Sequence, residues 1–78
     1  MYYVYVLQLV NNTFYTGFSS DLRERYRAHD DGDVPQTRKL RPIQLVYFSA
    51  FVSKQKALEF EKYLKSSSGF AFRNKHLV

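Results

Sequence analysis

The segment Met1–Gly17, MYYVYVLQLVNNTFYTG, decides the fold because it contains two strand-like runs separated by a short polar turn. Aromatic and β-branched residues are enriched in both runs, as is typical of β-strands. We therefore predict strands over Tyr2–Leu9 and Thr13–Gly17 that pair as a hairpin. The motif Tyr-Val-Tyr (3–5) lies in the first strand and Tyr-Thr-Gly (15–17) lies in the second.

The length of the hairpin turn determines whether Tyr5 and Tyr15 share one face of the sheet. Side chains alternate between faces along a strand. A two-residue asparagine turn would place the two tyrosines on opposite faces, whereas a three-residue loop (10–12) would pair Leu7 with Tyr15 and place both on one face. Asn12 suits the left-handed conformation that the longer loop needs. Convergence of the two phenols therefore predicts the longer loop or a bulge.

Downstream of the hairpin, the sequence predicts a helix, a loop and a third strand. Ser19 or Ser20 can cap a helix that runs to about His29, with an aspartate in its first turn. A polar loop over 30–41 follows, and Pro42 then opens a strand over roughly Ile43–Phe51. Both faces of that strand are largely apolar, so we expect it to be well covered.

The C-terminal third predicts two helices. Ser53 caps a helix to about Lys65, the run Ser66–Gly69 breaks it, and a short helix over Phe70–Lys75 follows. The complete order is ββαβαα, which predicts an α+β fold in which helices flank a small three-stranded antiparallel sheet. We expect one domain spanning 1–78, because a chain this short has room for only one compact core.

Composition narrows the class of partner. The net charge is +5 and the pI is about 9.6, which favours a polyanionic partner, most simply nucleic acid. Cysteine is absent, so neither disulfides nor thiolate metal sites can form. The longest apolar run, Tyr2–Val10, is too short to span a membrane, and no basic residue precedes it as in a secretory signal. We therefore expect a cytoplasmic protein.

Helical periodicity brings polar side chains toward the core. Leu22 and Tyr26 must pack inward, and at about 100° per residue they carry Arg25 and His29 with them. The later helix groups its apolar residues with a single acid, Glu61. Together with the two phenols, these are the groups that a phosphodiesterase site uses. A plain salt bridge between Arg25 and Glu61 is the structural alternative.

These motifs, in this order, resemble the GIY-YIG nuclease superfamily over nearly the whole chain. The two triplets, 3–5 and 15–17, match its name-giving motifs, YTGFSSDLRERYRAH resembles its YxG…DLxxR…H segment, and ALEFEKYLK resembles its helix with the metal-binding Glu. The nearest likeness is to small stand-alone bacterial proteins that resemble the N-terminal domain of an excision nuclease, which implies a role in DNA repair. The first triplet lacks its glycine, and Phe18 stands where some members carry lysine.

The resemblance implies a one-metal hydrolysis of DNA. Glu61 would hold one Mg²⁺ or Mn²⁺, and Arg25 would stabilise charge on the phosphoryl group. Tyr15 is the first choice, and Tyr5 the second, for the group that positions and deprotonates the attacking water. His29 would form a hydrogen bond with a tyrosine, relay the proton of that tyrosine or contact phosphate.

Further candidates contact the substrate in this interpretation. Asn74 matches, by distance along the chain, a family asparagine near the phosphate. We expect substrate contacts from Gly17, Arg38, Lys39, Arg41 and Asn74. Each residue also has a purely structural interpretation: the tyrosines as sheet aromatics, the glycine as a turn residue, His29 as a helix-end residue and the basic cluster as a solvated loop.

Three functions remain open at this level. The first is a metal-dependent DNA endonuclease. The second is a nucleic-acid-binding module of the same fold that cleaves weakly or not at all. The third is a protein-interaction domain, which should expose a large apolar patch. A homodimer is compatible with each of them.

Overall fold

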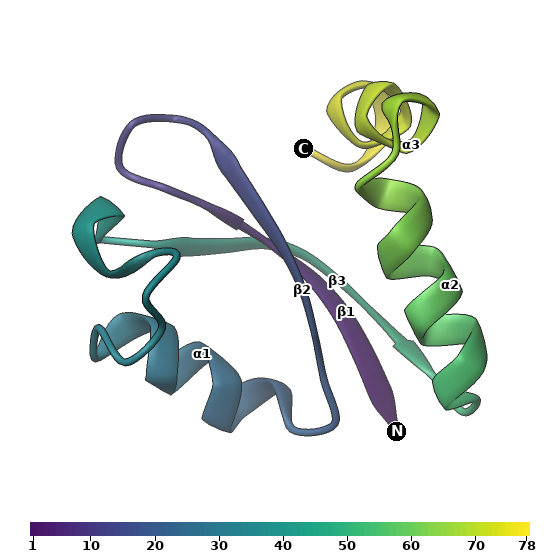
Figure 1. Cartoon of the computed structure of the whole chain (residues 1–78), viewed down its shortest axis with the longest axis horizontal. Helices are drawn as coiled ribbons and strands as arrows, with labels where there is room; N and C mark the ends of the chain where they lie inside the picture. Colours follow the sequence, from purple (N-terminus) through teal and green to yellow (C-terminus); the bar gives the residue numbers. More distant parts are fainter.

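A three-stranded antiparallel sheet forms the centre of the fold, in the computed structural model that describes residues 1–78 (Figure 1). The strands are β1 (Tyr2–Gln8), β2 (Phe14–Ser19) and β3 (Gln44–Phe51), arranged in the order β2-β1-β3. The helices are α1 (Leu22–Asp30), α2 (Lys54–Leu64) and α3 (Ser67–Phe72), with a 3₁₀ turn at Arg38–Leu40 and a π-helical turn at Arg73–Leu77. The α+β class and the order ββαβαα are confirmed.

The hairpin has the longer loop. Leu7 pairs with Tyr15 and Tyr5 pairs with Gly17, so the two phenols emerge on the same face. The backbone N–H of Leu9 donates to the carbonyl of Thr13 at 2.8 Å and closes the loop. Asn12 has φ 65°, the left-handed conformation that the parity argument required.

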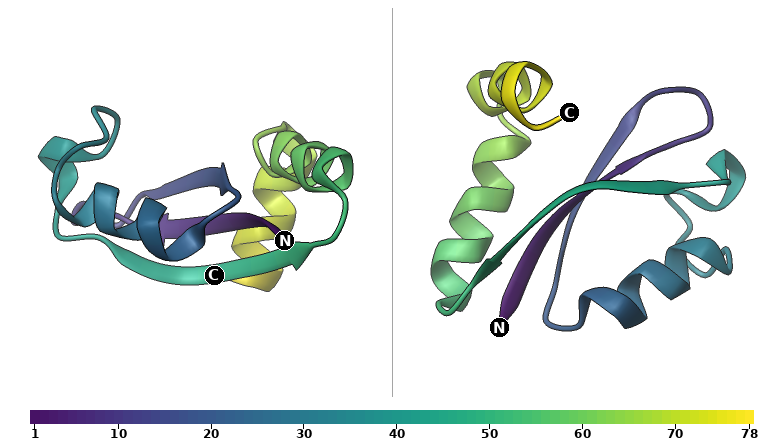
Figure 2. Two further views of the ribbon diagram at one scale, coloured as in Figure 1. Left: turned by 90° about the horizontal axis from the view of Figure 1, so that it is seen from below. Right: turned by 180° about the vertical axis from the view of Figure 1, so that it is seen from behind.

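The helices cover opposite faces of the sheet (Figures 1 and 2). On one face, Val4 and Val6 pack against Ala57 and Leu64 of α2. On the other, Leu22 and Tyr26 of α1 pack against the buried cluster Tyr5, Leu7, Leu9 and Ile43. Strand β1 supplies residues to both clusters because it is the central strand, with a neighbour on each side.

The expectation that the third strand would be well covered is wrong. Strand β3 lies at the sheet edge, and Phe48 is 52% exposed. The sequence of β3 is apolar on both faces, as in a central strand. However, β1 pairs with both β2 and β3, so β1 is the central strand. A bulge opposite Val6 and Leu7 also interrupts the pairing of β1 with β3.

The helix starts differ from the predicted ones at two places. Asp21, rather than Ser19 or Ser20, is the N-cap of α1, and its side chain accepts from the N–H of Glu24 at 3.1 Å. The serine run does interrupt the helical chain after Leu64, but Ser66 caps a new helix at once, so α3 begins at Ser67 and not at Phe70. Serine is a strong N-cap, and here that role outweighs its weak helix propensity. Ser53 caps α2 as predicted.

No helix combines the length and the apolar character that crossing a bilayer would require.

Candidate active site

Tyr5 reaches the edge of the sheet by crossing over Gly17. A Cβ atom at Gly17 would overlap the ring and the hydroxyl of Tyr5, so no larger residue fits beneath the phenol. Gly17 is itself buried under that ring. The structure therefore gives Gly17 a packing role beneath the Tyr5 ring.

A buried chain of hydrogen bonds fixes the Tyr5 hydroxyl. The Tyr5 Oη atom lies 2.8 Å from His29 Nε2, and His29 Nδ1 lies 2.8 Å from Thr37 Oγ1. His29 and Thr37 have no exposed surface. His29 comes from the last turn of α1, and Thr37 comes from the loop over 30–41, which folds beneath the end of that helix. His29 therefore cannot contact phosphate directly, and of its three predicted roles the bond to a tyrosine is the one observed.

The three side chains of this hydrogen-bonded chain, Tyr5, His29 and Thr37, are all uncharged. Burial, together with the positive charge of Arg25, lowers the pKa of His29 to about 4. Burial also raises the pKa of Tyr5, although hydrogen bonding to Arg25 opposes part of that shift. A neutral imidazole has a single N–H, so His29 donates through one ring nitrogen and accepts at the other, between the hydroxyls of Tyr5 and Thr37. Every member of the chain has its partner.

Tyr15 and Arg25 lie at the outer rim of this chain. Both side chains are half-buried. The ring of Tyr15 lies 6.4 Å from that of Tyr5 and 5.1 Å from that of His29, measured between centroids. Arg25 is beside both phenol oxygens, and its bond to Tyr5 is the main cause that raises the pKa of the Arg25 guanidinium. No carboxylate pairs with Arg25, so its charge is available to an anionic ligand.

Glu61 approaches the cluster from α2. Its side chain is 20% exposed, and Oε2 pairs with Lys65 Nζ at 3.0 Å. The salt bridge to Arg25, offered above as the structural alternative, does not form. The negative charge of Glu61 contributes to the raised pKa of Tyr5, so the carboxylate acts on the phenol from the α2 side. Glu61 Oε1 has no hydrogen-bond partner and is free to bind a ligand.

The donor set fits a hard divalent cation that keeps most of its waters. No group of three or more His, Cys, Asp or Glu side chains is close enough to enclose a metal. Glu61 would therefore be the single carboxylate ligand, with water and substrate oxygens completing the shell. Mg²⁺ is bound in this way in many phosphate-processing sites, whereas a closed structural site would need more protein ligands.

The basic cluster in the loop over 30–41 holds its own backbone. Arg38 Nε donates to the carbonyl of Gly32 at 2.7 Å, and Arg41 Nη1 donates to that of Asp30 at 3.1 Å. Arg41 Nε also donates to the Arg38 carbonyl at 2.9 Å. Lys39 is exposed. Two of the three predicted substrate contacts thus stabilise the loop that carries Thr37.

Asn74 lies away from the tyrosines, in a pocket beside the hairpin loop that Arg73 also lines. Sequence analysis missed Arg73 and Thr37. A buried imidazole needs a partner at each ring nitrogen, which predicts that a residue such as Thr37 exists but not which one it is. For Arg73, the absence of any acid after Glu61 was the available signal.

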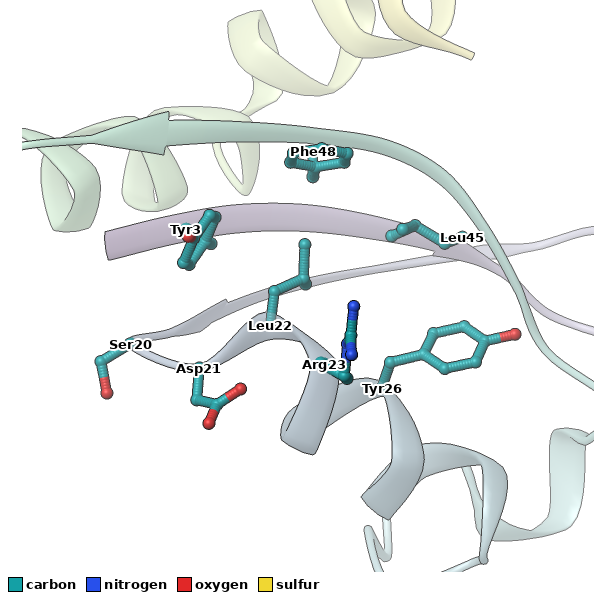
Figure 3. A pocket seen from close by; sticks show the side chains of 8 residues that line it. All are labelled: Tyr3, Ser20, Asp21, Leu22, Arg23, Tyr26, Leu45 and Phe48. Atoms are coloured by element: carbon teal, nitrogen blue, oxygen red, sulfur yellow. The ribbon is translucent and has the colours of Figure 1, made fainter. Parts of the chain in front are cut away.

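The largest cavity, of about 550 Å³, lies between the start of α1 and strands β1 and β3 (Figure 3). Tyr3, Leu22 and Phe48 are among its lining residues. No member of the Tyr5–His29–Thr37 chain lines it, and neither Arg25 nor Glu61 does. We therefore assign the chemistry to the phenol cluster, where the polar groups converge, rather than to the largest hollow.

Comparison with known proteins gives one consistent result. The model of the family described as "GIY-YIG catalytic domain" matches residues 1–75. A UPF0213 protein of Clostridium perfringens is 39% identical over 66 residues, covering 83% of this chain and 71% of that protein. A UPF0213 protein of Streptococcus pyogenes is 39% identical over 64 residues, covering 81% and 70%. The solution NMR structure of a UPF0213 protein from Bacillus halodurans superposes with a TM-score of 0.60 at 32% identity, covering 96% of this chain and 84% of the other.

Proposed function

The chain belongs to the GIY-YIG catalytic domain family, and from that premise we propose that it is a metal-dependent endonuclease that hydrolyses phosphodiester bonds in DNA. One observation carries the proposal: an arginine without an acidic partner lies beside two phenols that share one face of the sheet. A structural arginine in such a place would be expected to pair with a carboxylate. An unpaired guanidinium beside hydroxyl groups is suited to a phosphate.

The two phenols have different roles in this proposal. Tyr5 is fixed by His29, and burial raises its pKa, so its hydroxyl keeps its proton and holds the geometry of the site. Tyr15 lies at the rim, where its hydroxyl can meet the attacking water. Tyr15 therefore positions that water and relays its proton: the phenol oxygen takes up the water proton while the phenolic proton passes to solvent, the water oxygen bonds to phosphorus, and the bond from phosphorus to the leaving oxygen breaks.

Arg25 and Glu61 have electrostatic roles in this proposal. Arg25 donates to the phosphoryl oxygens, on which negative charge increases in the transition state. Glu61 would hold one Mg²⁺ or Mn²⁺, and such an ion supplies Lewis-acid stabilisation of the phosphate and of the leaving alkoxide. Lys65 must then release or share the Glu61 carboxylate.

A cleavage assay with matched controls tests the proposal. The purified protein is incubated with linear, supercoiled and branched DNA, in Mg²⁺, in Mn²⁺ and in chelator. Arg25→Ala and Glu61→Ala should each lower the cleavage rate by about 10²–10³. The controls are Arg27→Ala and Glu59→Ala, which remove the same charges from exposed positions of the same two helices and should cut like the parent.

The outcomes separate the candidate functions. Cutting that persists in Glu61→Ala would refute the assigned metal ligand. Binding without cutting, with either metal and on every DNA form, would refute the nuclease and favour the binding module. Loss of cutting in the control variants as well would show that general positive or negative charge, and not the proposed cluster, sustains activity.

A further inference from the structure

Arg73 is a buried cation without a counter-charge. The residue is 5% exposed, and burial lowers the pKa of its guanidinium. The guanidinium carbon lies 5.0 Å from the ring centroid of Phe14 and 4.6 Å from that of Phe70. The two aromatic rings fix the orientation of the group, but they supply only part of the stabilisation that a desolvated charge needs.

No acid lies in the elements around Arg73. The segment from Lys62 to Val78 contains Lys62, Lys65, Arg73 and Lys75 and no Asp or Glu. The hairpin loop that faces it, Asn11–Thr13, also has no acid. The one ion pair of the protein joins Lys65 to Glu61 and does not involve Arg73. The structure thus keeps a positive charge buried with no acidic side chain beside it.

One edge of the guanidinium reaches an open pocket. Arg73 Nε and Nη2 both donate to Asn74 Oδ1, at 3.3 and 3.1 Å. Nη1 makes no hydrogen bond. The buried side-chain atoms that lack a hydrogen-bond partner are Thr16 Oγ1 and Ser49 Oγ, and Nη1 is not one of them. Nη1 is therefore accessible to solvent, at a pocket of about 460 Å³ between the hairpin loop and the C-terminal helices.

The amides that line this pocket are arranged as donors. Asn74 Oδ1 is occupied by Arg73, and Asn12 Oδ1 accepts from Gln8 Nε2 at 3.3 Å. Each asparagine therefore has its Nδ2 hydrogens free to donate outward. Three side chains, one charged and two neutral, thus line the pocket with N–H groups, and none of the side chains that line it is acidic, a combination that favours an anion.

We propose that the pocket formed by Arg73, Asn74 and Asn12 binds a phosphate of the DNA backbone other than the one that is cleaved. The identity of the ligand as DNA rests on the proposed nuclease function. Its negative charge does not, because the pocket alone indicates an anion. Phe14, whose ring lies under the guanidinium, precedes Tyr15 in β2. The pocket and the phenol cluster therefore lie on the two sides of one edge strand, and a DNA strand that passes over this edge can contact both.

Metal-free DNA binding tests the site without cleavage. A fluorescent oligonucleotide is titrated in chelator at several salt concentrations, and log K is plotted against log[salt]. Arg73→Gln should reduce the magnitude of the slope by about one, the value for a lost phosphate contact. Lys75→Gln removes the same charge from an exposed position two residues away, and it should leave the slope nearly unchanged. Equal slopes in the parent and Arg73→Gln, or equal losses in both variants, would overturn the proposal.

A measurement on the unmodified protein covers the case in which Arg73→Gln does not fold. The Nε–Hε NMR signal of Arg73 should shift on titration with inorganic phosphate and with the oligonucleotide, and Arg73→Lys, which keeps the charge, should retain the salt slope but bind less tightly. An Arg73 signal that neither ligand moves would overturn the site, even if the protein binds DNA. A protein that binds no DNA, but whose Arg73 signal responds to phosphate, would refute the nuclease while leaving the anion site intact.

Discussion

Two buried threonines on opposite sides of the sheet differ in their hydrogen bonds. Thr37, under α1, has no exposed surface and bonds His29. Thr16, in β2, is 5% exposed and faces the α2 side with Val6, and its Oγ1 has no partner. The side that carries the phenols contains a polar core, the Tyr5–His29–Thr37 chain, in which each group is paired, beside an apolar cluster. The other side is an apolar core that contains unpaired hydroxyls as minor defects.

The difference shows where the sequence specifies function and where it specifies only packing. A neutral imidazole under α1 fixes Tyr5, and this arrangement holds only if both of its ring nitrogens are bonded. The α2 side needs only shape and apolar surface, and valine or threonine satisfies that need almost equally well. Replacing a buried threonine by valine should therefore change stability in opposite directions on the two sides.

The largest expected effect is a loss of stability in mild acid. The pKa of His29 is about 4 in the folded protein and 6.5 when unperturbed, so the unfolded chain takes up the proton first. The contribution is fully present above pH 6.5 and is lost as the pH falls toward about 4, which amounts to roughly 3 kcal/mol. Urea unfolding of the parent and of His29→Gln between pH 4 and 7.5 measures it.

The comparison of the two proteins isolates the imidazole, because all other titrating groups are common to both. The difference in unfolding free energy between the parent and His29→Gln should shrink as the pH is lowered. Parallel stability curves over this range would mean that His29 titrates alike in the folded and unfolded chains, and the polar core would then lack the neutral imidazole on which it depends.

Some features of the sheet and of the phenol cluster could be predicted from the sequence, and others could not. Strand parity made the placement of Tyr5 and Tyr15 depend on the length of the hairpin loop alone, and the left-handed preference of Asn12 suited the longer loop that is observed, because both are local properties of one hairpin. The edge position of β3 and the bond from Thr37 to His29 depend on contacts between distant segments. Periodicity within one element contains no information on such contacts.

The C-terminal region shows the same limit. Helix periodicity predicted Glu61 on the apolar side of α2, and its side chain is indeed only 20% exposed. It did not show that Lys65, one turn later, would pair with that carboxylate, nor that Arg73 would enter between two phenylalanine rings. Long cationic side chains have many rotamers, and packing chooses among them.

Thr37→Val should produce the next largest effect. The substitution keeps the shape of the side chain but leaves His29 Nδ1 buried without a partner, which costs roughly 2 kcal/mol of unfolding free energy. Cleavage should slow, because the imidazole no longer fixes Tyr5, while metal-free DNA binding should not change. Urea unfolding and cleavage rates measure the two effects, and Thr37→Ser, which keeps the hydroxyl, should restore most of both.

Thr16→Val is the matching substitution on the other side, and its effect should be the smallest and of opposite sign. The hydroxyl of Thr16 is already buried without a hydrogen bond, so its replacement removes a desolvated polar atom and adds a methyl group of the same size. We expect stability to rise by about 1 kcal/mol, measured by urea unfolding, with cleavage unchanged. A loss of stability as large as that in Thr37→Val would show that both sides of the sheet depend on paired hydroxyls, and the distinction between a polar functional core and an apolar supporting core would fail.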